Sequence, residues 1–219
     1  MCGRFAQADP LEIIAEQFGI EVIDLDLSPR YNVAPGQQVA VIIKEETREI
    51  VDLKWGLVPF WAKDPSIGNR MINARAETVL EKPSYKNAMK KRRCLIPASG
   101  FYEWKKDGKV KVPYYFRHNN GKPFGLAGLW ETWKDPDGNE LKTFTIITTE
   151  PNELAARVHN RMPVIISEEN YGTWLDTANP PQKAQALLAP YPADRMEAYP
   201  VSTMVNSPAN DSEELVRPV

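Results

Sequence analysis

The sequence predicts one α+β domain over residues 1–219, with a mostly antiparallel, curved or barrel-like β-sheet core and flanking helices. Its second half consists mainly of short alternating segments separated by turn signals, which is typical of antiparallel strands. Helical spacing of apolar residues is confined to short stretches, and no repeat or low-complexity linker divides the chain. With 219 residues, of which 42% are hydrophobic, the chain can bury one sizeable core.

The first elements are a terminal strand and a packing helix. Asp9 and Pro10 are predicted to be the N-cap and first helical residue, and Glu12 would complete a capping box. Apolar residues at helical spacing follow until Gly19, which is expected to end the helix.

A hairpin and a helix are expected next. Residues 31–36 end in a Pro-Gly turn, which projects a rigid loop. Residues 39–43 and 49–55 are strand-like and are joined across a charged turn, so they predict a hairpin. The basic stretch 83–93 is predicted to be helical.

The second half predicts an antiparallel meander that becomes a barrel if its edges close. Asp-Gly, Asn-Gly and Asp-to-Gly turns separate its four main segments. These strands are expected at residues 101–105, 110–116, 124–130 and 142–148. Shorter strands are expected at residues 94–98, 164–166 and 196–201, and short helices at 152–158, 168–175 and 181–188.

Charge and composition exclude several classes of protein. A net charge of −2 argues against a uniformly basic coat, so any polyanion binding must come from local clusters. Residues 82–93 hold such a cluster, for which a solvated face is an equal alternative. No apolar run of membrane-spanning length and no secretory signal is seen, so we expect a cytoplasmic protein, nucleoid-associated in a bacterium or nuclear in a eukaryote.

Two cysteines and two histidines offer no metal-ligand spacing, so neither a metal nor a cofactor is expected. No apolar helix face is left unassigned, which predicts a monomer.

The distinctive chemistry begins at Cys2. Removal of Met1 by an aminopeptidase would give this residue both a thiol and a primary amine, with pKa values near ~8.5 and ~7.7–8.0. Such an aminothiol captures an aldehyde: the amine forms a Schiff base, and the thiolate closes a slowly hydrolysing thiazolidine. A frayed terminus with an incidental cysteine is the alternative.

Polar and aromatic residues elsewhere supply possible partners. Phe60 and Trp61 lie in a proline-containing loop, either to fill a satellite core or to stack on bases. Glu103 lies among aromatic residues, where desolvation would raise its pKa and suit it to proton transfer, although the wet face of a strand is an equal alternative. His159 is expected to orient a ligand or to be structural.

Together these motifs resemble the SOS-response-associated peptidase (SRAP) family. The blocks that carry the resemblance run in family order over essentially the whole chain: MCGRF at 1–5, YNVAPG at 31–36, INARAET at 72–78, GFYEW at 100–104, HNRMP at 159–163 and VSTMVN at 201–206.

The resemblance implies an SRAP-like fold and a protein that crosslinks itself to abasic sites in single-stranded DNA during the DNA damage response, without a metal or cofactor. It implies that Cys2 forms the crosslink and that Asn73, Glu103 and His159 surround it. The DNA-binding positions that it implies are Arg4, Pro35, Phe60, Trp61, Arg75 and Arg161. The family often has two tryptophans where this chain has Phe60 and Trp61, which affects the strength of stacking.

The chemistry of these side chains agrees with that implication. An abasic deoxyribose is mostly a closed hemiacetal, and Glu103 is expected to transfer the protons that release its aldehyde. His159 would assist at the opened sugar or a phosphate, and Asn73 would orient the amine and the sugar.

Two other functions remain open at this stage. Cys2, His159 and Asn73 could form a thiol peptidase that acts on the chain's own leader by removing Met1. The chain could also be a non-catalytic single-stranded DNA binding module.

Overall fold

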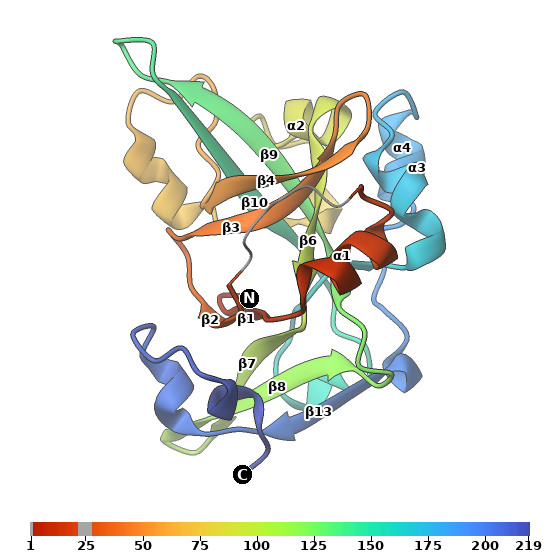
Figure 1. Ribbon diagram of the computed structural model, residues 1–219. Helices are drawn as coiled ribbons and strands as arrows, with labels where there is room; N and C mark the ends of the chain where they lie inside the picture. Colours follow the sequence, from red (N-terminus) through yellow and green to blue (C-terminus); the bar gives the residue numbers. More distant parts are fainter. Residues whose placement is uncertain (1, 22–27) are drawn as a thin grey trace.

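The computed structural model describes residues 2–21 and 28–219, so Met1 and its expected removal lie outside the described residues (Figure 1). The described residues form thirteen strands: β1 (Phe5–Gln7), β2 (Arg30–Val33), β3 (Gln38–Lys44), β4 (Arg48–Trp55), β5 (Asn73–Arg75), β6 (Arg93–Ala98), β7 (Gly100–Asp107), β8 (Val110–His118), β9 (Phe124–Lys134), β10 (Glu140–Thr149), β11 (Met162–Pro163), β12 (Ile165–Ile166) and β13 (Met196–Pro200).

The helices lie around these strands (Figure 1). The α-helices are α1 (Leu11–Phe18), α2 (Lys86–Lys91), α3 (Tyr171–Leu175) and α4 (Pro181–Gln185). Short 3₁₀ helices occupy Pro65–Arg70, Ala76–Thr78, Ala155–Arg157, Glu168–Asn170, Ala193–Arg195, Thr203–Asn206 and Glu213–Val216. None of the helices in the described part of the chain has the length and hydropathy needed to cross a bilayer.

The larger sheet closes on itself and confirms the barrel-like, mostly antiparallel core. Its strands pair in the order β10, β4, β3, β6 and β9, and β9 pairs again with β10. Closure depends on a parallel pairing of β4 with β10, and β5 also pairs parallel to β10. A single closed ring leaves few unpaired edges.

The predicted continuous meander is wrong in one respect. β7 pairs with β8, and β9 pairs with β10, but β8 lies in a second, five-stranded sheet of order β13, β8, β7, β1, β2. The chain therefore passes from one sheet to the other at the turn after β8 instead of forming a third hairpin.

Alternation along the barrel strands separates two of the three clusters of buried hydrophobic residues in the described part of the chain. On β3, Val41 and Ile43 face a cluster that includes Phe5, Trp55 and Phe144. Ile42 belongs to a second cluster, which includes residues of all four α-helices. Alternate residues of each barrel strand thus fill the barrel interior, and the residues between them pack against the helices.

Two predictions about helix ends are wrong. Helix α1 starts one residue later than expected, with Pro10 as its N-cap and no side-chain cap, because the Asp9 carboxylate accepts a hydrogen bond from the Ser99 hydroxyl. Gly19 ends it in the left-handed conformation, as predicted. Helix α2 is shorter than the expected 83–93, because Arg93 already belongs to β6.

The amino-terminal strand is an interior strand of the five-stranded sheet. β1 pairs with β2 on one side and with β7 on the other, with Phe5 opposite Phe101. Close packing beside it requires Gly100, because a Cβ there would lie 2.4 Å from the Phe116 carbonyl oxygen. Cys2, just before β1, is consequently fully buried.

Candidate active site

Cys2 and Glu103 are brought together by the antiparallel pairing of β1 and β7. The residues before Phe5 run beside those after Phe101, and the Tyr102 N–H donates to the Arg4 carbonyl at 3.0 Å. Glu103 is only 4% exposed, so the alternative that it lies on the solvent-exposed face of a strand is wrong. Burial raises the pKa of Glu103 to about 7. Burial and then the charge of Glu103 raise the pKa of the Cys2 thiol.

His159 also lies close to this carboxylate. Its Nδ1 atom is 4.0 Å from Oε2 of Glu103. It follows the 3₁₀ helix Ala155–Arg157, and the Arg161 N–H donates to Nδ1 at 3.1 Å. Burial lowers the pKa of His159, which favours the neutral ring at pH 7. The bond from the Arg161 N–H is compatible with the neutral tautomer that accepts at Nδ1 and carries its proton on Nε2.

Glu103 and His159 open onto a cavity of about 510 Å³. Sequence reasoning missed four residues of its wall, namely Trp104, Lys106, Lys111 and Asn206. Trp104 Nε1 donates to the Asn206 amide oxygen at 2.7 Å, and the Arg4 guanidinium lies 6.0 Å from the centre of the indole. Trp104 and Asn206 belong to the motif blocks at 100–104 and 201–206, which could have identified them.

Asn73 carries an unused hydrogen-bond acceptor. Its Nδ2 donates to the Ile72 carbonyl at 2.9 Å, whereas its buried Oδ1 has no partner among the described residues. Ile72 packs against the same cluster that contains Cys2. An unsatisfied buried acceptor costs stability and is often explained by a function.

Three of the expected DNA-binding positions are at the surface. Phe60 and Trp61 are 56% and 48% exposed, so of the two alternatives for this pair the satellite core is wrong. The Val58 N–H donates to Thr143 Oγ1, and Trp133 Nε1 donates to the Ala62 carbonyl, which fixes their loop to the barrel. Arg75 is also exposed, on β5.

Pro35, another of the expected positions, is exposed too. It precedes Gly36, whose φ of 87° requires the freedom of glycine.

The remaining two expected positions are already used by the fold. Arg4 Nη1 donates to Asn32 Oδ1 at 2.7 Å and to the Val205 carbonyl at 2.6 Å. Arg161 forms a two-pronged ion pair with Glu77 and also donates to the Thr148 carbonyl. Each guanidinium therefore has a structural role beside any contact that it makes with a phosphate.

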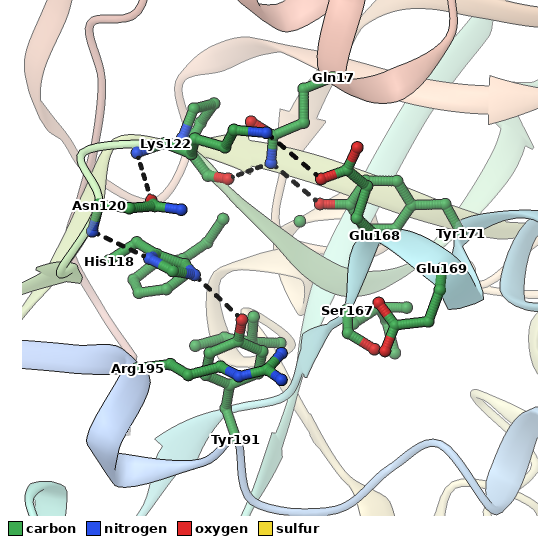
Figure 2. A pocket seen from close by; sticks show the side chains of 15 residues that line it. Gln17, His118, Asn120, Lys122, Ser167, Glu168, Glu169, Tyr171, Tyr191 and Arg195 are labelled. Carbon is green, nitrogen blue, oxygen red and sulfur yellow. Dashed lines mark hydrogen bonds and ion pairs between the residues drawn. The ribbon is translucent and has the colours of Figure 1, made fainter.

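A separate cavity of about 300 Å³ lies between β8, β12 and α3 and contains none of the expected site residues (Figure 2). Two cations, Lys122 and Arg195, are balanced in its wall by Glu168 and Glu169. Lys122 lies 3.6 Å from Glu168. Burial lowers the pKa of His118 in the same wall, which leaves no net charge to attract a polyanion.

The described residues hold no cluster of three or more His, Cys, Asp or Glu side chains arranged for a metal ion. Neither Cys2 nor Cys94 forms a disulfide.

The fold and the site define a class of protein that combines a closed β-barrel with a buried thiol before the amino-terminal strand, a neighbouring buried carboxylate, and an imidazole 4.0 Å from that carboxylate. The sequence matches the SOS response associated peptidase (SRAP) family over residues 1–208, and the chain belongs to that family.

Relatives and a solved structure support this membership. The chain is 49% identical to the abasic site processing protein YoqW of Bacillus subtilis, over 99% of each chain. It is 31% identical to the abasic site processing protein YedK of Escherichia coli, over the full length of both. A crystal structure of a protein from Bacteroides thetaiotaomicron superposes with a TM-score of 0.90 at 28% identity, over the whole of both chains.

Proposed function

We propose that this protein recognises abasic sites in single-stranded DNA and captures them covalently through Cys2, as a monomer. The names of YoqW and YedK support abasic-site processing. The observation that carries the proposal is the burial of Cys2 beside a carboxylate whose pKa is about 7 and which itself lines a cavity.

Capture begins with the α-amino group that removal of Met1 gives to Cys2. The amine adds to the aldehyde carbon of the opened sugar, and loss of one water leaves a C=N bond. The Cys2 sulfur then adds to that carbon, and its proton goes to the nitrogen, so the product is a thiazolidine ring. Aldehyde and aminothiol combine with loss of one water and no redox change.

Glu103 has a pKa suited to both directions of proton transfer in this sequence. Near pH 7 it is present in both forms, so it can give a proton to the leaving ring oxygen or hydroxide and take one from the thiol. The raised pKa of the Cys2 thiol favours an order in which the amine reacts first and the sulfur is deprotonated only when the imine is in place.

The same observation disfavours the thiol peptidase suggested by the family's description. A cysteine nucleophile that attacks a peptide needs a lowered thiol pKa, usually through a histidine. Here burial and Glu103 raise the pKa of the thiol, and the His159 ring has the Glu103 carboxylate 4.0 Å from its Nδ1.

The test is incubation of the purified protein, its Met1 removal verified by intact mass, with an abasic oligonucleotide, followed by a denaturing gel. We expect a stable covalent band. Cys2→Ala keeps the amine but lacks the sulfur, so it should give a band only after borohydride reduction of the imine. Glu103→Gln should slow band formation by roughly 10²–10⁴-fold.

A stable band of undiminished yield from Cys2→Ala would overturn the thiazolidine. Turnover of peptides without any band would support the peptidase, and retention lost in salt would support a binding module.

A further inference from the structure

The hairpin of β7 and β8 carries a basic pair at the mouth of the active-site cavity. Lys106 and Lys111 both line the cavity and are directly opposite each other in the register of the two strands. Directly opposite residues on antiparallel strands have Cβ atoms about 4.5–5.5 Å apart, and like charges in such positions are destabilising. The fold therefore places two like-charged side chains side by side, an arrangement that is unfavourable without a counter-charge.

No carboxylate in the described part of the chain relieves this repulsion. Among the residues that the structure describes, no carboxylate lies within ion-pair distance of Lys106 or Lys111, and both side chains are exposed. By contrast, Lys122 and Lys134 elsewhere on the surface each face a glutamate. A bound anion would relieve the repulsion between the two lysines.

The position of the pair indicates which anion it would receive. Glu103 and His159 line the same cavity, so an anion held by the lysines lies next to the reacting sugar. In a DNA strand the nearest anion to any sugar is its own phosphodiester. The charge of Lys106 also reaches His159: burial is the main cause of the lowered pKa of that ring, and Lys106 makes the smallest contribution.

We propose that Lys106 and Lys111 form a phosphate subsite that holds the phosphodiester flanking the abasic sugar and so positions the lesion over Cys2 and Glu103. This subsite rests on the proposed function. The two lysines act on the phosphate by charge and do not transfer protons to the reacting atoms, so they are positioning residues.

The hairpin itself offers a matched control. Lys105 and Lys109 are exposed on the same hairpin but do not line the cavity. The double variants K106Q/K111Q and K105Q/K109Q therefore have the same net charge and change the same hairpin, and only the first removes the proposed subsite. A K106R/K111R variant retains both charges.

The experiment measures the rate of covalent capture at limiting protein concentration across a salt series. For K106Q/K111Q we expect about a tenfold slower capture at low salt. The slope of log rate against log salt should become shallower by about 0.7 for each lost phosphate contact on a single strand. The capture rate of K105Q/K109Q should fall much less, and K106R/K111R should retain most of the wild-type rate.

A neutral methylphosphonate at one flanking linkage tests the contact directly. It should slow the wild type about as much as K106Q/K111Q slows the natural oligonucleotide, and it should cause little further loss in that variant. Urea unfolding without DNA should show K106Q/K111Q at least as stable as the wild type, since a repulsive pair has been removed.

The outcomes separate the two proposals. If the wild type forms no covalent product with any abasic oligonucleotide, the proposed function fails, and the subsite fails with it. If the wild type captures the lesion but the two glutamine double variants lose rate equally, or neither loses rate, only the subsite is overturned. Full additivity of the methylphosphonate and K106Q/K111Q effects would also overturn it.

Discussion

Oε2 of Glu103 lies 4.0 Å from Nδ1 of His159, and the same Nδ1 receives the Arg161 N–H at 3.1 Å. The carboxylate and the imidazole are thus held in a fixed relation by the backbone of the loop that carries the histidine. Because Glu103 is buried with a raised pKa, this arrangement has consequences for stability as well as for chemistry.

Glu103→Gln should stabilise the protein above neutral pH. The pKa of Glu103 rises from an ordinary 4.5 to about 7 on folding, so between these values the folded state binds more protons than the unfolded state. The free energy of unfolding therefore falls as pH rises through this window, by up to roughly 3 kcal/mol.

Urea unfolding of wild type and E103Q between pH 4 and 8.5 measures this difference. The two proteins should converge at the acid end, diverge between about pH 4.5 and 7, and keep a constant difference above that, with the variant more stable. A wild type that is the more stable protein at pH 8 would contradict the raised pKa.

Asn73→Ala should lower the rate of capture without lowering stability. The substitution removes a buried acceptor that has no partner among the described residues, and the Ile72 carbonyl still accepts from Trp55 Nε1 and the Ile146 N–H. Thermal unfolding and the capture rate should be measured together.

Asn32→Ala is the matched control for this substitution. The Asn32 side chain accepts from Arg4 and donates to the Ser207 and Asn210 carbonyls, so its loss should destabilise the protein by about 1–3 kcal/mol. A comparable loss of stability in N73A would show that Asn73 is a structural residue.

Phe60→Ala and Trp61→Ala should weaken binding to single strands while leaving the fold intact. Both rings are exposed, so the free energy of unfolding should change by less than about 0.5 kcal/mol. Loss of stacking should cost about 1–3 kcal/mol of binding free energy per base, with the larger effect at Trp61.

Fluorescence anisotropy with an undamaged oligonucleotide tests these variants separately from capture. Ile13→Ala removes an exposed apolar side chain of helix α1 and should leave the affinity unchanged. Equal affinities for W61A and I13A would exclude stacking by this loop.

Glu77→Gln should strengthen binding to DNA. Arg161 is paired with Glu77, and its additional bond to the Thr148 carbonyl keeps it in place when that carboxylate is neutralised. Removing one partly exposed competing charge is worth about 0.2–1 kcal/mol, or about 1.4- to fivefold in affinity at low salt.

Glu81→Gln makes the same charge change at an exposed site nearby and serves as the control. Anisotropy at several salt concentrations compares the two variants. A lower affinity of E77Q for DNA would show that Glu77 positions Arg161 for the phosphate instead of competing with the phosphate.

Local signals in the sequence predicted the individual strands better than their arrangement. Alternation and turn residues predicted both strands of the β3–β4 hairpin to within one residue at each end. The parallel pairing of β4 with β10 has no local signature, because it joins Trp55 to Phe144 across the chain. The missing helix cap has the same cause, since Asp9 bonds Ser99, which is 90 residues away.

The sequence predicted which residues form the site, but not which of them already form hydrogen bonds or ion pairs within the fold. Glu103 and His159 meet as expected. The sequence alone does not show that Asn32 and Glu77 occupy the guanidinium groups of Arg4 and Arg161. The lysines of the cavity mouth were missed because only the strand register shows that Lys106 and Lys111 are opposite each other.

The interior position of β1 also limits when the amino terminus can be reached by other enzymes. β1 has no β7 to pair with until residues up to Asp107 have been synthesised. At about 5–20 residues per second, the ribosome needs roughly 5–20 s for those first hundred or so residues. Any trimming ahead of Cys2 is therefore expected on the nascent chain, before docking of β1 encloses the thiol.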